Sequence, residues 1–265
     1  MKLAVLGSAS SWYVADLQRA AGDRHVIVPA AFTHLASTVA DSGASVRSGE
    51  MDLAACDVVL VRSMPPGSLE QVVFRMDALA QLATAGVKVV NSPRSLETAI
   101  DKYLSTVQLQ RAGLATPRTI VCQTAEQAQA AFEELGGDVA VKPLFGGEGR
   151  GIARVSDAAI ARRVFRSLEQ IGAALYLQQF VPHEGHDLRL LVIGERVVGM
   201  RRRNDDDWRT NISLGGKAEP LEVNDELAEQ AQRAAAAVGA LLAGVDLLPG
   251  KDGKLYALEV NAVPG

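Results

Sequence analysis

The chain lacks several features that mark whole classes of protein. Its two cysteines, Cys56 and Cys122, are too few for a disulfide framework or a four-cysteine zinc site. No run of eighteen apolar residues occurs, and the N-terminus does not show the pattern of a signal peptide, so we predict no membrane association and a cytoplasmic location. The net charge of −4 lacks the basic excess of many nucleic-acid binders, so no nucleic-acid partner is expected.

Familiar catalytic and nucleotide-binding signatures are also missing. One glycine follows the first apolar run closely, so the dinucleotide fingerprint G-x-G-x-x-G is absent. No G-x-S-x-G elbow surrounds the N-terminal serines, and no H-R-D or D-F-G motif occurs, which disfavours a serine hydrolase and a protein kinase. His183 and His186 have H-x-x-H spacing but no third ligand nearby, so zinc is not expected.

What the chain does have is a 48% hydrophobic composition over 265 residues, enough to bury a core. Its first ninety residues alternate short β-branched runs with helical periodicity, which predicts an α/β lobe with a parallel sheet. The predicted strands are Leu3–Leu6, Val26–Val28, Val58–Val61 and Val87–Val90, and the predicted helices are Val14–Ala21 and Gln71–Ala85. This lobe is interpreted as Rossmann-like in shape, without dinucleotide binding.

The alternation of predicted strands and helices changes after Asn91-Ser92-Pro93, which marks a predicted domain boundary. A single helix is expected over about 94–111, followed by an α+β region with antiparallel pairing. Its predicted strands include 188–193 and 196–200, joined by a tight turn at Gly194-Glu195, and a long helix is predicted over 225–242.

The last two predicted strands carry the strongest chemical signal. A two-residue turn at Asp252-Gly253 would place Asp246 directly opposite Glu259, with Asn261 on the same face. The other face would carry the core residues Val245, Leu247, Leu258 and Val260. Opposed carboxylates repel unless a cation lies between them, and oxygen ligands suit Mg²⁺. The alternative is a solvated face, or pairing of each carboxylate with a lysine.

A second signal is the run from Lys142 to Gly151, which holds four glycines in six residues. Such a loop can bring backbone N–H groups close to anionic oxygens. It lacks the Gly-Lys-Ser/Thr ending of a P-loop, and a strand follows it, so we predict a flap over nucleotide phosphates. The alternative is a flexible hairpin with Lys142 exposed.

Two weaker patterns accompany these signals. The extended stretch Gln178–Val181 could offer its backbone to an adenine edge, with Asp187 accepting ribose hydroxyls, although an edge strand explains it as well. Arg201–Arg203 followed by Asp205–Asp207 is either a solvated charge run or an anion-binding strand end before a mobile loop.

Together these residues resemble the ATP-grasp superfamily, and within it the RimK-type α-L-glutamate ligases. The resemblance runs from about Asn91 to the C-terminus, with a weaker pre-ATP-grasp likeness in residues 1–90. Gln179 stands where the family often has Glu. The motifs that carry the resemblance are Asp101-Lys102, Val141-Lys142, Leu177–Val181, Asp187–Arg189, Trp208–Asn211, Gly215-Gly216, Gly244–Asp246 and Leu258–Gly265.

The resemblance implies a fold and a division of the chain. The fold is an α/β Rossmann-like pre-ATP-grasp lobe followed by an α+β ATP-grasp domain of two subdomains. The expected boundaries are 1–91 for the first lobe, 92–180 for the central subdomain with the flap, and 181–265 for the C-terminal subdomain with the metal site.

The resemblance also implies ATP and Mg²⁺ (or Mn²⁺) as cofactors, with site residues as follows. Arg209 would stabilise the transferring phosphoryl group, with Asn211 beside it, while Arg62 and Arg202 would grip substrate carboxylates. The remaining implied ligands are Lys102, Lys142, Gly146, Gly147 and Gly149 for the phosphates, Gln178, Gln179, Phe180, Val181 and Asp187 for the nucleoside, and Asp246, Glu259 and Asn261 for the metal.

The implied reaction is ATP-dependent ligation of a carboxylate and an amine through an acyl phosphate. The expected substrates are L-glutamate and a small carboxylate-bearing acceptor, with a pterin-type coenzyme favoured. The alternatives are a glutamate ligase that acts on a protein tail, a non-catalytic ATP-binding regulatory module, and an ATP-grasp kinase. The resemblance also allows a homo-oligomer.

Overall fold

A computed structural model describes residues 1–41, 43–147 and 149–264, so Ser42, Glu148 and Gly265 lie outside the description. Glu148 belongs to the predicted flap, and Gly265 ends the predicted C-terminal subdomain. The chain divides into two compact units, and each is described by itself. Unit 1 comprises Met1–Glu97, Gly239–Leu242 and the residues from Ala262 on, while unit 2 comprises Thr98–Val238 and Ala243–Asn261. The three-part division expected from the sequence remains a prediction.

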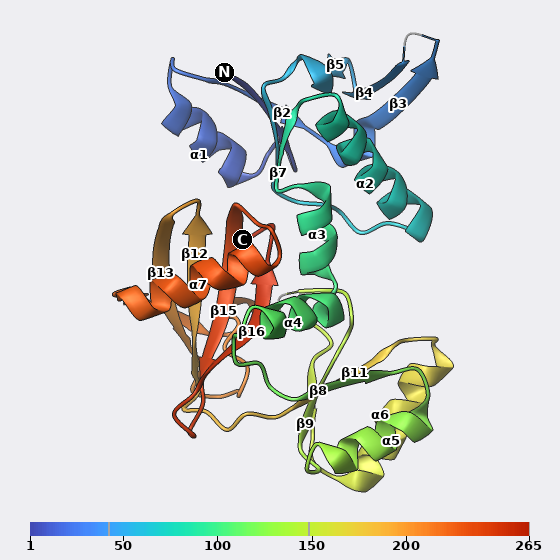
Figure 1. Cartoon of the computed structure of the whole chain (residues 1–265), viewed down its shortest axis with the longest axis vertical. Coiled ribbons are helices and arrows are strands. Elements are labelled where there is room, and N and C mark those ends of the chain that lie inside the picture. Colours follow the sequence, from blue (N-terminus) through green and yellow to red (C-terminus); the bar gives the residue numbers. More distant parts are fainter. Residues whose placement is uncertain (42, 148, 265) are drawn as a thin grey trace. The chain divides into compact units, whose positions relative to one another are not determined.

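Unit 1 is built on a parallel sheet of four strands in the order β2-β1-β6-β7 (Figure 1). These four strands and their parallel pairing confirm the sequence prediction. Each strand is short and rich in apolar residues, because a parallel sheet is covered on both faces. The bounds are β1 (Lys2–Leu6), α1 (Trp12–Ala21), β2 (Val26–Ala30), β6 (Val58–Val61), α2 (Leu69–Thr84) and β7 (Lys88–Val90).

A three-stranded antiparallel sheet in unit 1 was not expected from the sequence. It consists of β3 (Leu35–Ala40), β4 (Gly43–Ser48) and β5 (Met51–Asp52), between two short 3₁₀ turns at Phe32–His34 and Leu53–Ala55. Most of its residues are exposed, with Val46 and Ser48 as buried exceptions. Few apolar positions therefore alternate along these strands, and the period-2 pattern that reveals a half-buried strand is weak.

The single helix expected over 94–111 is wrong, because the chain forms two helices there. They are α3 (Pro93–Ile100) and α4 (Lys102–Arg111), separated by Asp101 in an extended conformation. The Asp101 carboxylate accepts a hydrogen bond from the backbone N–H of Leu104 at 3.0 Å, which caps α4. The break places Lys102 at the first position of a new helix.

Unit 2 contains two sheets. The first is antiparallel, in the order β10-β9-β11-β8, and α5 and α6 cover one of its faces. A cluster of buried residues around Phe132 and Phe165 fills the space between these helices and the sheet. The bounds are β8 (Thr119–Cys122), α5 (Ala125–Glu134), β9 (Val139–Lys142), β10 (Ala153–Val155), α6 (Ala158–Gln170) and β11 (Leu175–Gln179).

Alternation along β11 decides which side chains reach the functional pocket. Leu175 and Leu177 point into the helix-covered core, and both are fully buried. Tyr176 and Gln178 therefore lie on the opposite face, since successive strand residues alternate. Lys142 pairs with Tyr176, and Thr119 pairs with Gln178, so four polar side chains share that face.

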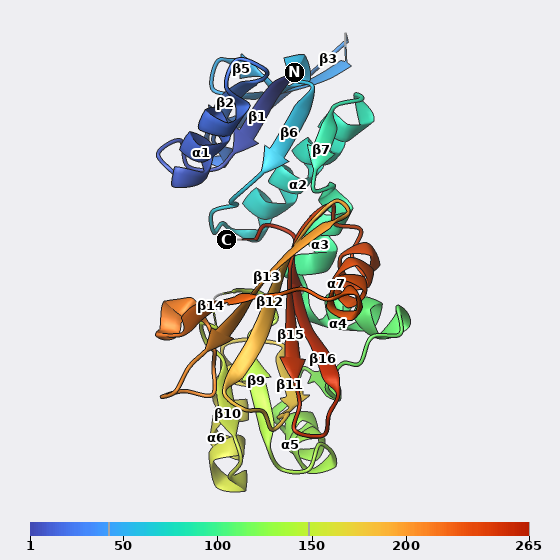
Figure 2. The same ribbon diagram turned by 90° about the vertical axis from the view of Figure 1, so that its left-hand side faces the viewer.

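The second sheet of unit 2 has five strands in the order β14-β13-β12-β15-β16 (Figure 2). The two-residue turn at Gly194-Glu195 is confirmed, because Ile193 pairs with Arg196. Helix α7 packs against this sheet, but it ends at Ala237 rather than at the predicted residue 242, and the left-handed Gly239 follows. The bounds are β12 (His186–Ile193), β13 (Arg196–Arg203), a 3₁₀ turn (Ile212–Leu214), β14 (Lys217–Leu221), α7 (Asp225–Ala237), β15 (Leu242–Pro249) and β16 (Leu255–Asn261).

No helix in the described part of the chain combines the length and apolar character needed to span a bilayer.

Asn91 joins three segments of unit 1, and its side chain is 1% exposed. Its amide nitrogen donates to the carbonyls of Leu242 (2.7 Å) and Ala262 (2.5 Å). Its amide oxygen accepts from the backbone N–H groups of Leu241 (2.8 Å) and Leu242 (3.1 Å). The residue that marked a boundary in the sequence is therefore a buried connector.

Replacing Asn91 with Ala should destabilise the protein by about 2–4 kcal/mol, because several buried backbone groups lose their partners. The matched control is Asn224→Ala, which removes the exposed N-cap of α7 and should cost about 1 kcal/mol. Urea denaturation followed by circular dichroism gives both values. Equal costs for the two variants would contradict the connecting role of Asn91.

Candidate functional site

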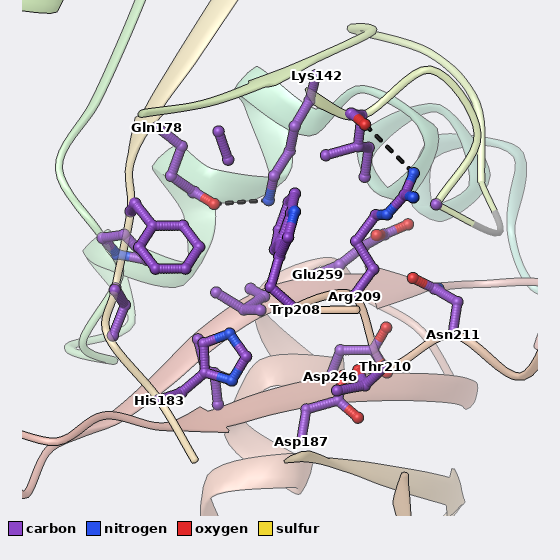
Figure 3. Close-up of a pocket in the computed structure, with 18 of the residues that line it drawn as sticks. Lys142, Gln178, His183, Asp187, Trp208, Arg209, Thr210, Asn211, Asp246 and Glu259 are labelled. Atoms are coloured by element: carbon purple, nitrogen blue, oxygen red, sulfur yellow. Dashed lines mark hydrogen bonds between the residues drawn. The ribbon is translucent and has the colours of Figure 1, made fainter. Parts of the chain in front are cut away.

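The pocket of interest lies within unit 2, and residues from both of its sheets line it (Figure 3). The full lining is Pro117, Ala140, Lys142, Gly149, Ile152, Gln178, Gln179, Phe180, Val181, His183, Asp187, Arg202, Trp208, Arg209, Thr210, Asn211, Asp246, Leu248, Leu258 and Glu259. Most of the site residues predicted from the sequence therefore line one pocket.

Asp246 lies directly opposite Glu259 in the β15–β16 pair, as expected, and Gly244 lies opposite Asn261. The reason differs from the one predicted. The strands end at Pro249 and Leu255, which pair with each other, so the turn is longer than two residues. An irregularity between Asp246 and Leu247 shifts the register by one residue and restores the opposition.

The same irregularity changes the direction of Leu258. Ala257 pairs with Leu247 and Glu259 pairs with Asp246, so Leu258 is the extra residue of a bulge. It lines the pocket beside Glu259, and its predicted place in the core is wrong. The other three predicted core residues, Val245, Leu247 and Val260, are fully buried.

Two arginines compensate the charge of Asp246. Arg189 Nη1 lies 2.6 Å from Asp246 Oδ1, and Arg202 Nη2 lies 3.1 Å from the same oxygen. Arg189 is on β12, directly beside β15, and Arg202 is on β13, the next strand along, so the sheet itself sets these contacts. Burial opposes the charged form of Arg202, but Asp246 and Asp187 outweigh it and raise the pKa of this guanidinium.

Glu259 is less well compensated than Asp246. Burial raises the pKa of its carboxyl, and the neighbouring Asp246 raises it further, while Lys102, Lys142 and Arg189 act against this. The Asn261 amide fits its surroundings when its nitrogen faces Glu259 Oε1 (2.9 Å) and its oxygen faces Arg189 Nη1 (2.8 Å). A carboxyl with a raised pKa beside a second carboxylate favours a cation at this position.

Asp246, Glu259 and Asn261 fit a divalent cation by donor chemistry. They offer two carboxylates and, once the Asn261 amide turns its oxygen from Arg189 toward Glu259, an amide oxygen. These are the hard ligands that Mg²⁺ takes together with water and phosphate oxygens. Their mutual repulsion would fall if such an ion bound between them. These three residues could therefore hold Mg²⁺, as expected from the sequence.

Lys142 ends β9 and points into the pocket, where its Nζ donates to Gln178 Oε1 at 2.6 Å (Figure 3). Burial lowers the pKa of Lys142 to about 8, a shift that Glu259 opposes and Lys102 reinforces. Lys102 is 8% exposed, and its Nζ donates to the carbonyl of Gly146 at 2.5 Å. Lys102 thus holds the start of the flap.

The flap follows β9 and returns as β10, which confirms the predicted strand–loop–strand hairpin. Gly149 has φ +72°, and a Cβ at this position would lie 2.6 Å from Asn211 Oδ1 and 2.9 Å from Leu214 Cδ1. Glycine is therefore needed there both for its backbone conformation and for the close approach to Asn211. Gly146 also has a positive φ, but open space surrounds its missing Cβ, as it does at Gly147.

An aromatic group forms another wall of the pocket. The Arg154 guanidinium lies 3.6 Å from the centroid of the Phe180 ring, and Trp208 meets this ring edge-on at 5.5 Å. His183 is a further ring neighbour at 5.8 Å, and its Nδ1 accepts from the backbone N–H of Gly185. Flat apolar surfaces with few polar groups suit a nucleobase.

The Gln178 side chain is 3% exposed, so it does not reach the pocket as a free hydrogen-bonding group. The backbone N–H of Gln179 already bonds the carbonyl of Arg118, and that of Phe180 bonds the carbonyl of Asp138. Val181 lines the pocket together with Gln179. A nucleobase at this edge would meet the strand's remaining backbone groups, as predicted from the sequence.

Asp187 and Arg202 bind each other in the ligand-free protein. Arg202 Nε donates to Asp187 Oδ1 at 2.8 Å, Arg202 Nη2 donates to Asp187 Oδ2 at 2.5 Å, and both residues are nearly fully buried. Burial raises the pKa of Asp187, while Arg202 opposes the change. Arg202 was expected to grip a substrate carboxylate; instead, its guanidinium binds carboxylates of the protein.

Arg62 also has partners other than the expected substrate carboxylate. Its Nη2 donates to the carbonyl of Pro264 at 2.6 Å, and its guanidinium lies 4.5 Å from the centroid of the Tyr13 ring. Burial lowers the pKa of Arg62. These contacts lie within unit 1 and assign Arg62 a role in holding the C-terminal segment.

Arg209, the expected catalytic residue, faces the pocket from the loop after β13. Its Nη2 donates to Asp207 Oδ2 at 2.5 Å, its Nε lies 3.1 Å from the same oxygen, and both side chains are partly exposed. Its Nη1 also reaches the carbonyl of Ile152 at 3.5 Å, at the end of the flap (Figure 3). To bind a substrate, the Arg209 guanidinium must either share its contact with Asp207 or exchange it for a contact with the substrate.

Arg189 and Trp208 had no role predicted from the sequence, although both are in the motifs that carry the family resemblance. Arg189 could have been found from strand alternation, since it shares a face with Asp187 two residues earlier. Trp208 carries no such signal, because a loop, rather than a regular element, places it against Phe180.

Comparisons with known proteins agree with this geometry. Residues 99–265 match the model of the RimK-like ATP-grasp domain. The chain belongs to this family. Its reaction class is that of an ATP-dependent carboxylate–amine ligase, and enzymes of this family use ATP and Mg²⁺.

Two curated relatives and one solved structure illustrate the similarity. The tetrahydromethanopterin:alpha-L-glutamate ligase of Methanosarcina acetivorans is 34% identical over 82% of this chain and 70% of its own. The alpha-aminoadipate–LysW ligase LysX of Saccharolobus solfataricus is 32% identical over 68% of this chain and 67% of its own. The ATP-grasp ligase PsnB, solved with minimal precursor, Mg and ADP, shares the fold with a TM-score of 0.76 and 23% identity, over 99% of this chain and 89% of its own.

Glu259→Gln should abolish the contribution of Mg²⁺ to ATP binding while leaving the fold intact, because the amide keeps the shape and loses the charge. Titration calorimetry of ATP with and without Mg²⁺ measures that contribution. Glu219→Gln on the exposed part of β14 is the control and should behave as the wild type. Wild-type Mg²⁺ dependence in Glu259→Gln would place the metal elsewhere.

ATP affinity should fall as the pH rises through about 8, the pKa of Lys142 in the free protein. The sign follows from the charge: the ammonium attracts phosphate, and the neutral amine that forms above this pH does not. ATP titrations between pH 7 and 10 measure the alkaline limb. Lys142→Met should bind ATP weakly and lose the limb; an unchanged limb in this variant would assign the titration to another group.

Proposed function

We propose that this protein adds L-glutamate to the carboxylate of a small acceptor, with a pterin-type coenzyme as the favoured acceptor. The observation that carries the ligase chemistry is the convergence of Asp246, Glu259 and Lys142 on a pocket that Gly149 of the flap also lines. The likeness to a tetrahydromethanopterin:alpha-L-glutamate ligase over 82% of the chain supports the choice of glutamate and of a pterin-type acceptor.

The reaction divides into two transfers. An oxygen of the acceptor carboxylate attacks the γ-phosphorus of ATP, and the bond from that phosphorus to the β,γ-bridging oxygen breaks, which gives an acyl phosphate and ADP. The amine of glutamate then attacks the acyl carbon, phosphate leaves, and the nitrogen loses a proton. One amide forms for each ATP consumed.

The chain's residues take the following roles in this proposal. Lys142 binds phosphate oxygens from the end of β9, and Lys102 exchanges the Gly146 carbonyl for phosphate. A bound Mg²⁺ would neutralise charge on the transferring phosphoryl group. The Phe180 ring and the backbone of the segment Gln178–Val181 hold the base, and Asp187 accepts from the ribose. Asn211 and Gly149 keep the flap close to the loop after β13.

Arg209 is the proposed catalytic residue, because it lines the pocket beside the end of the flap. Its planar guanidinium can bind two oxygens of a phosphoryl group in parallel, once Asp207 gives up part of its contact. Charge that grows during the transfer would then be stabilised in the transition state more than in the ground state.

The test of the proposed function is a mass-spectrometric screen of carboxylate-bearing acceptors with ATP, Mg²⁺ and L-glutamate. The expected product is a pterin-type acceptor that carries the mass of one added glutamyl group, formed together with ADP and phosphate. A glutamyl group on a protein tail instead would favour the alternative candidate, a glutamate ligase that acts on a protein tail. Phosphate transferred to a hydroxyl without any amine would overturn the ligase in favour of a kinase.

Arg209→Lys should reduce kcat about a hundredfold to a thousandfold, the cost of losing one such donor, while ATP binds nearly normally. Lysine keeps the charge but loses the planar fork. The control is Asp207→Asn, which removes the partner of Arg209 in the ligand-free protein and should leave kcat within a few-fold of wild type. Steady-state rates and ATP calorimetry of both variants decide this. A near-wild-type kcat in Arg209→Lys would reduce Arg209 to a surface ion pair.

A further inference from the structure

A chain of hydrogen bonds crosses the polar face of the first unit 2 sheet and links Lys142 to the start of α4. Lys142 Nζ lies 2.6 Å from Gln178 Oε1, and Gln178 Nε2 lies 3.3 Å from the hydroxyl of Tyr176. The Tyr176 hydroxyl lies 2.9 Å from Thr106 Oγ1, and Thr106 Oγ1 donates to the carbonyl of Lys102 at 2.7 Å.

The direction of every hydrogen bond in this chain follows from the donor inventory. An ammonium only donates, so Gln178 must present its oxygen to Lys142 and its NH₂ group to Tyr176. Thr106 uses its single proton on the Lys102 carbonyl, so the Tyr176 hydroxyl donates to Thr106 and accepts from Gln178. Burial raises the pKa of Tyr176, which keeps its hydroxyl a donor.

The second proton of the Gln178 amide is also satisfied. Gln178 Nε2 lies 3.1 Å from Thr119 Oγ1, and the Thr119 hydroxyl donates in turn to the carbonyl of Pro117 at 2.9 Å. Both Gln178 and Tyr176 are nearly fully buried. Since each partner is fixed, the amide oxygen has one orientation, toward Lys142.

The local sequence builds this arrangement. Gln178 pairs with Ala140 on β9 and with Thr119 on β8, and the small Ala140 side chain leaves space between Gln178 and Lys142. Tyr176 pairs directly with Lys142. Gln178 was selected in the sequence as part of a nucleoside-binding stretch, but its side chain faces Lys142 and the two hydroxyls.

We propose that Gln178 is a positioning residue that holds the Lys142 ammonium in the pocket, and that Tyr176 and Thr106 tie this ammonium to the helix that carries Lys102. The chain places both lysines in one connected network, so that a shift of α4 is transmitted to Lys142. The consequence for catalysis rests on the proposed function, in which Lys142 binds ATP phosphates.

Opposite substitutions at Gln178 test the proposal. Gln178→Met keeps the length of the side chain and removes the acceptor, so the charged form of Lys142 loses support and the alkaline limb of ATP affinity moves to lower pH. Gln178→Glu places a carboxylate beside the ammonium, so the limb moves to higher pH. ATP calorimetry with Mg²⁺ between pH 6.5 and 10 measures both, and a structural role alone would not produce shifts of opposite sign.

The hydrogen bonds of Gln178 set both the expected loss of ATP affinity and the choice of a control variant. At pH 7, Gln178→Met should weaken ATP binding about tenfold, the scale of one hydrogen bond to a charged group. Thr119→Val removes the side branch and leaves the chain from Lys142 to Thr106 complete, so its limb should stay where it is in the wild type. If Gln178→Met fails to fold, Tyr176→Phe deletes one link without a change of shape and should weaken ATP binding less than tenfold.

The outcomes separate this proposal from the proposed function. If Lys142→Met loses the limb while both Gln178 variants keep the wild-type limb, the positioning role is wrong and the phosphate role of Lys142 stands. If Lys142→Met binds ATP as the wild type does, the phosphate role itself is wrong. Opposite limb shifts in the two Gln178 variants, absent from the same variants made in the Lys142→Met background, would support the positioning role.

Discussion

The repulsion between Asp246 and Glu259 is the constraint on which the site depends. Two carboxylates directly opposed across an antiparallel pair destabilise the sheet unless cations compensate them. Arg189 on β12 and Arg202 on β13 supply part of that compensation. Glu259 has Lys102, Lys142 and Arg189 as its cationic neighbours, and its raised pKa records that these do not offset burial and Asp246.

Charge balance explains how so many ionisable groups share one buried region. The carboxylates of Asp187, Asp246 and Glu259 face four cationic side chains, which leaves a formal side-chain charge of +1 in this region; the four are Arg189, Arg202, Lys102 and Lys142. Buried charges are tolerated when they are paired and hydrogen-bonded. A divalent cation that arrives together with ATP would offset part of the negative charge that the nucleotide brings into this region, whereas ATP alone would bring all of it.

Much of the fold could be predicted from the sequence where buried positions produce a clear pattern of apolar residues. The four parallel strands of unit 1 are short β-branched runs, and the hairpin at Gly194-Glu195 carries its own turn signal. The exposed meander β3–β5 and the break at Asp101 were missed, because the first buries few side chains and the second depends on a single capping carboxylate. The opposition of Asp246 and Glu259 was predicted correctly, although the two-residue turn on which the prediction rested is wrong. The loop is longer, and a bulge at Leu258 offsets the change in pairing that the longer loop causes.

The site was predictable in its membership but not in its contacts. Most of the residues that line the pocket, to which we assign phosphate, base and metal binding as proposals, could be found from motifs, because those motifs are local in sequence. The pairing of Arg202 with Asp187, and of Arg62 with Pro264, depends on strands and segments that meet only in the folded chain. The direction of the Gln178 side chain follows from sheet alternation, from the Tyr176 hydroxyl two residues away and from the Thr119 hydroxyl, which is distant in sequence.

The most direct test of the metal site is anomalous diffraction from crystals grown with Mn²⁺ and a non-hydrolysable ATP analogue. The account predicts a peak between the Asp246 and Glu259 carboxylates, at roughly 2.0–2.2 Å from their oxygens, with an analogue phosphate oxygen in the same coordination sphere. A peak elsewhere in the chain, with Arg189 and Arg202 still bound to Asp246 and no metal beside Glu259, would contradict it.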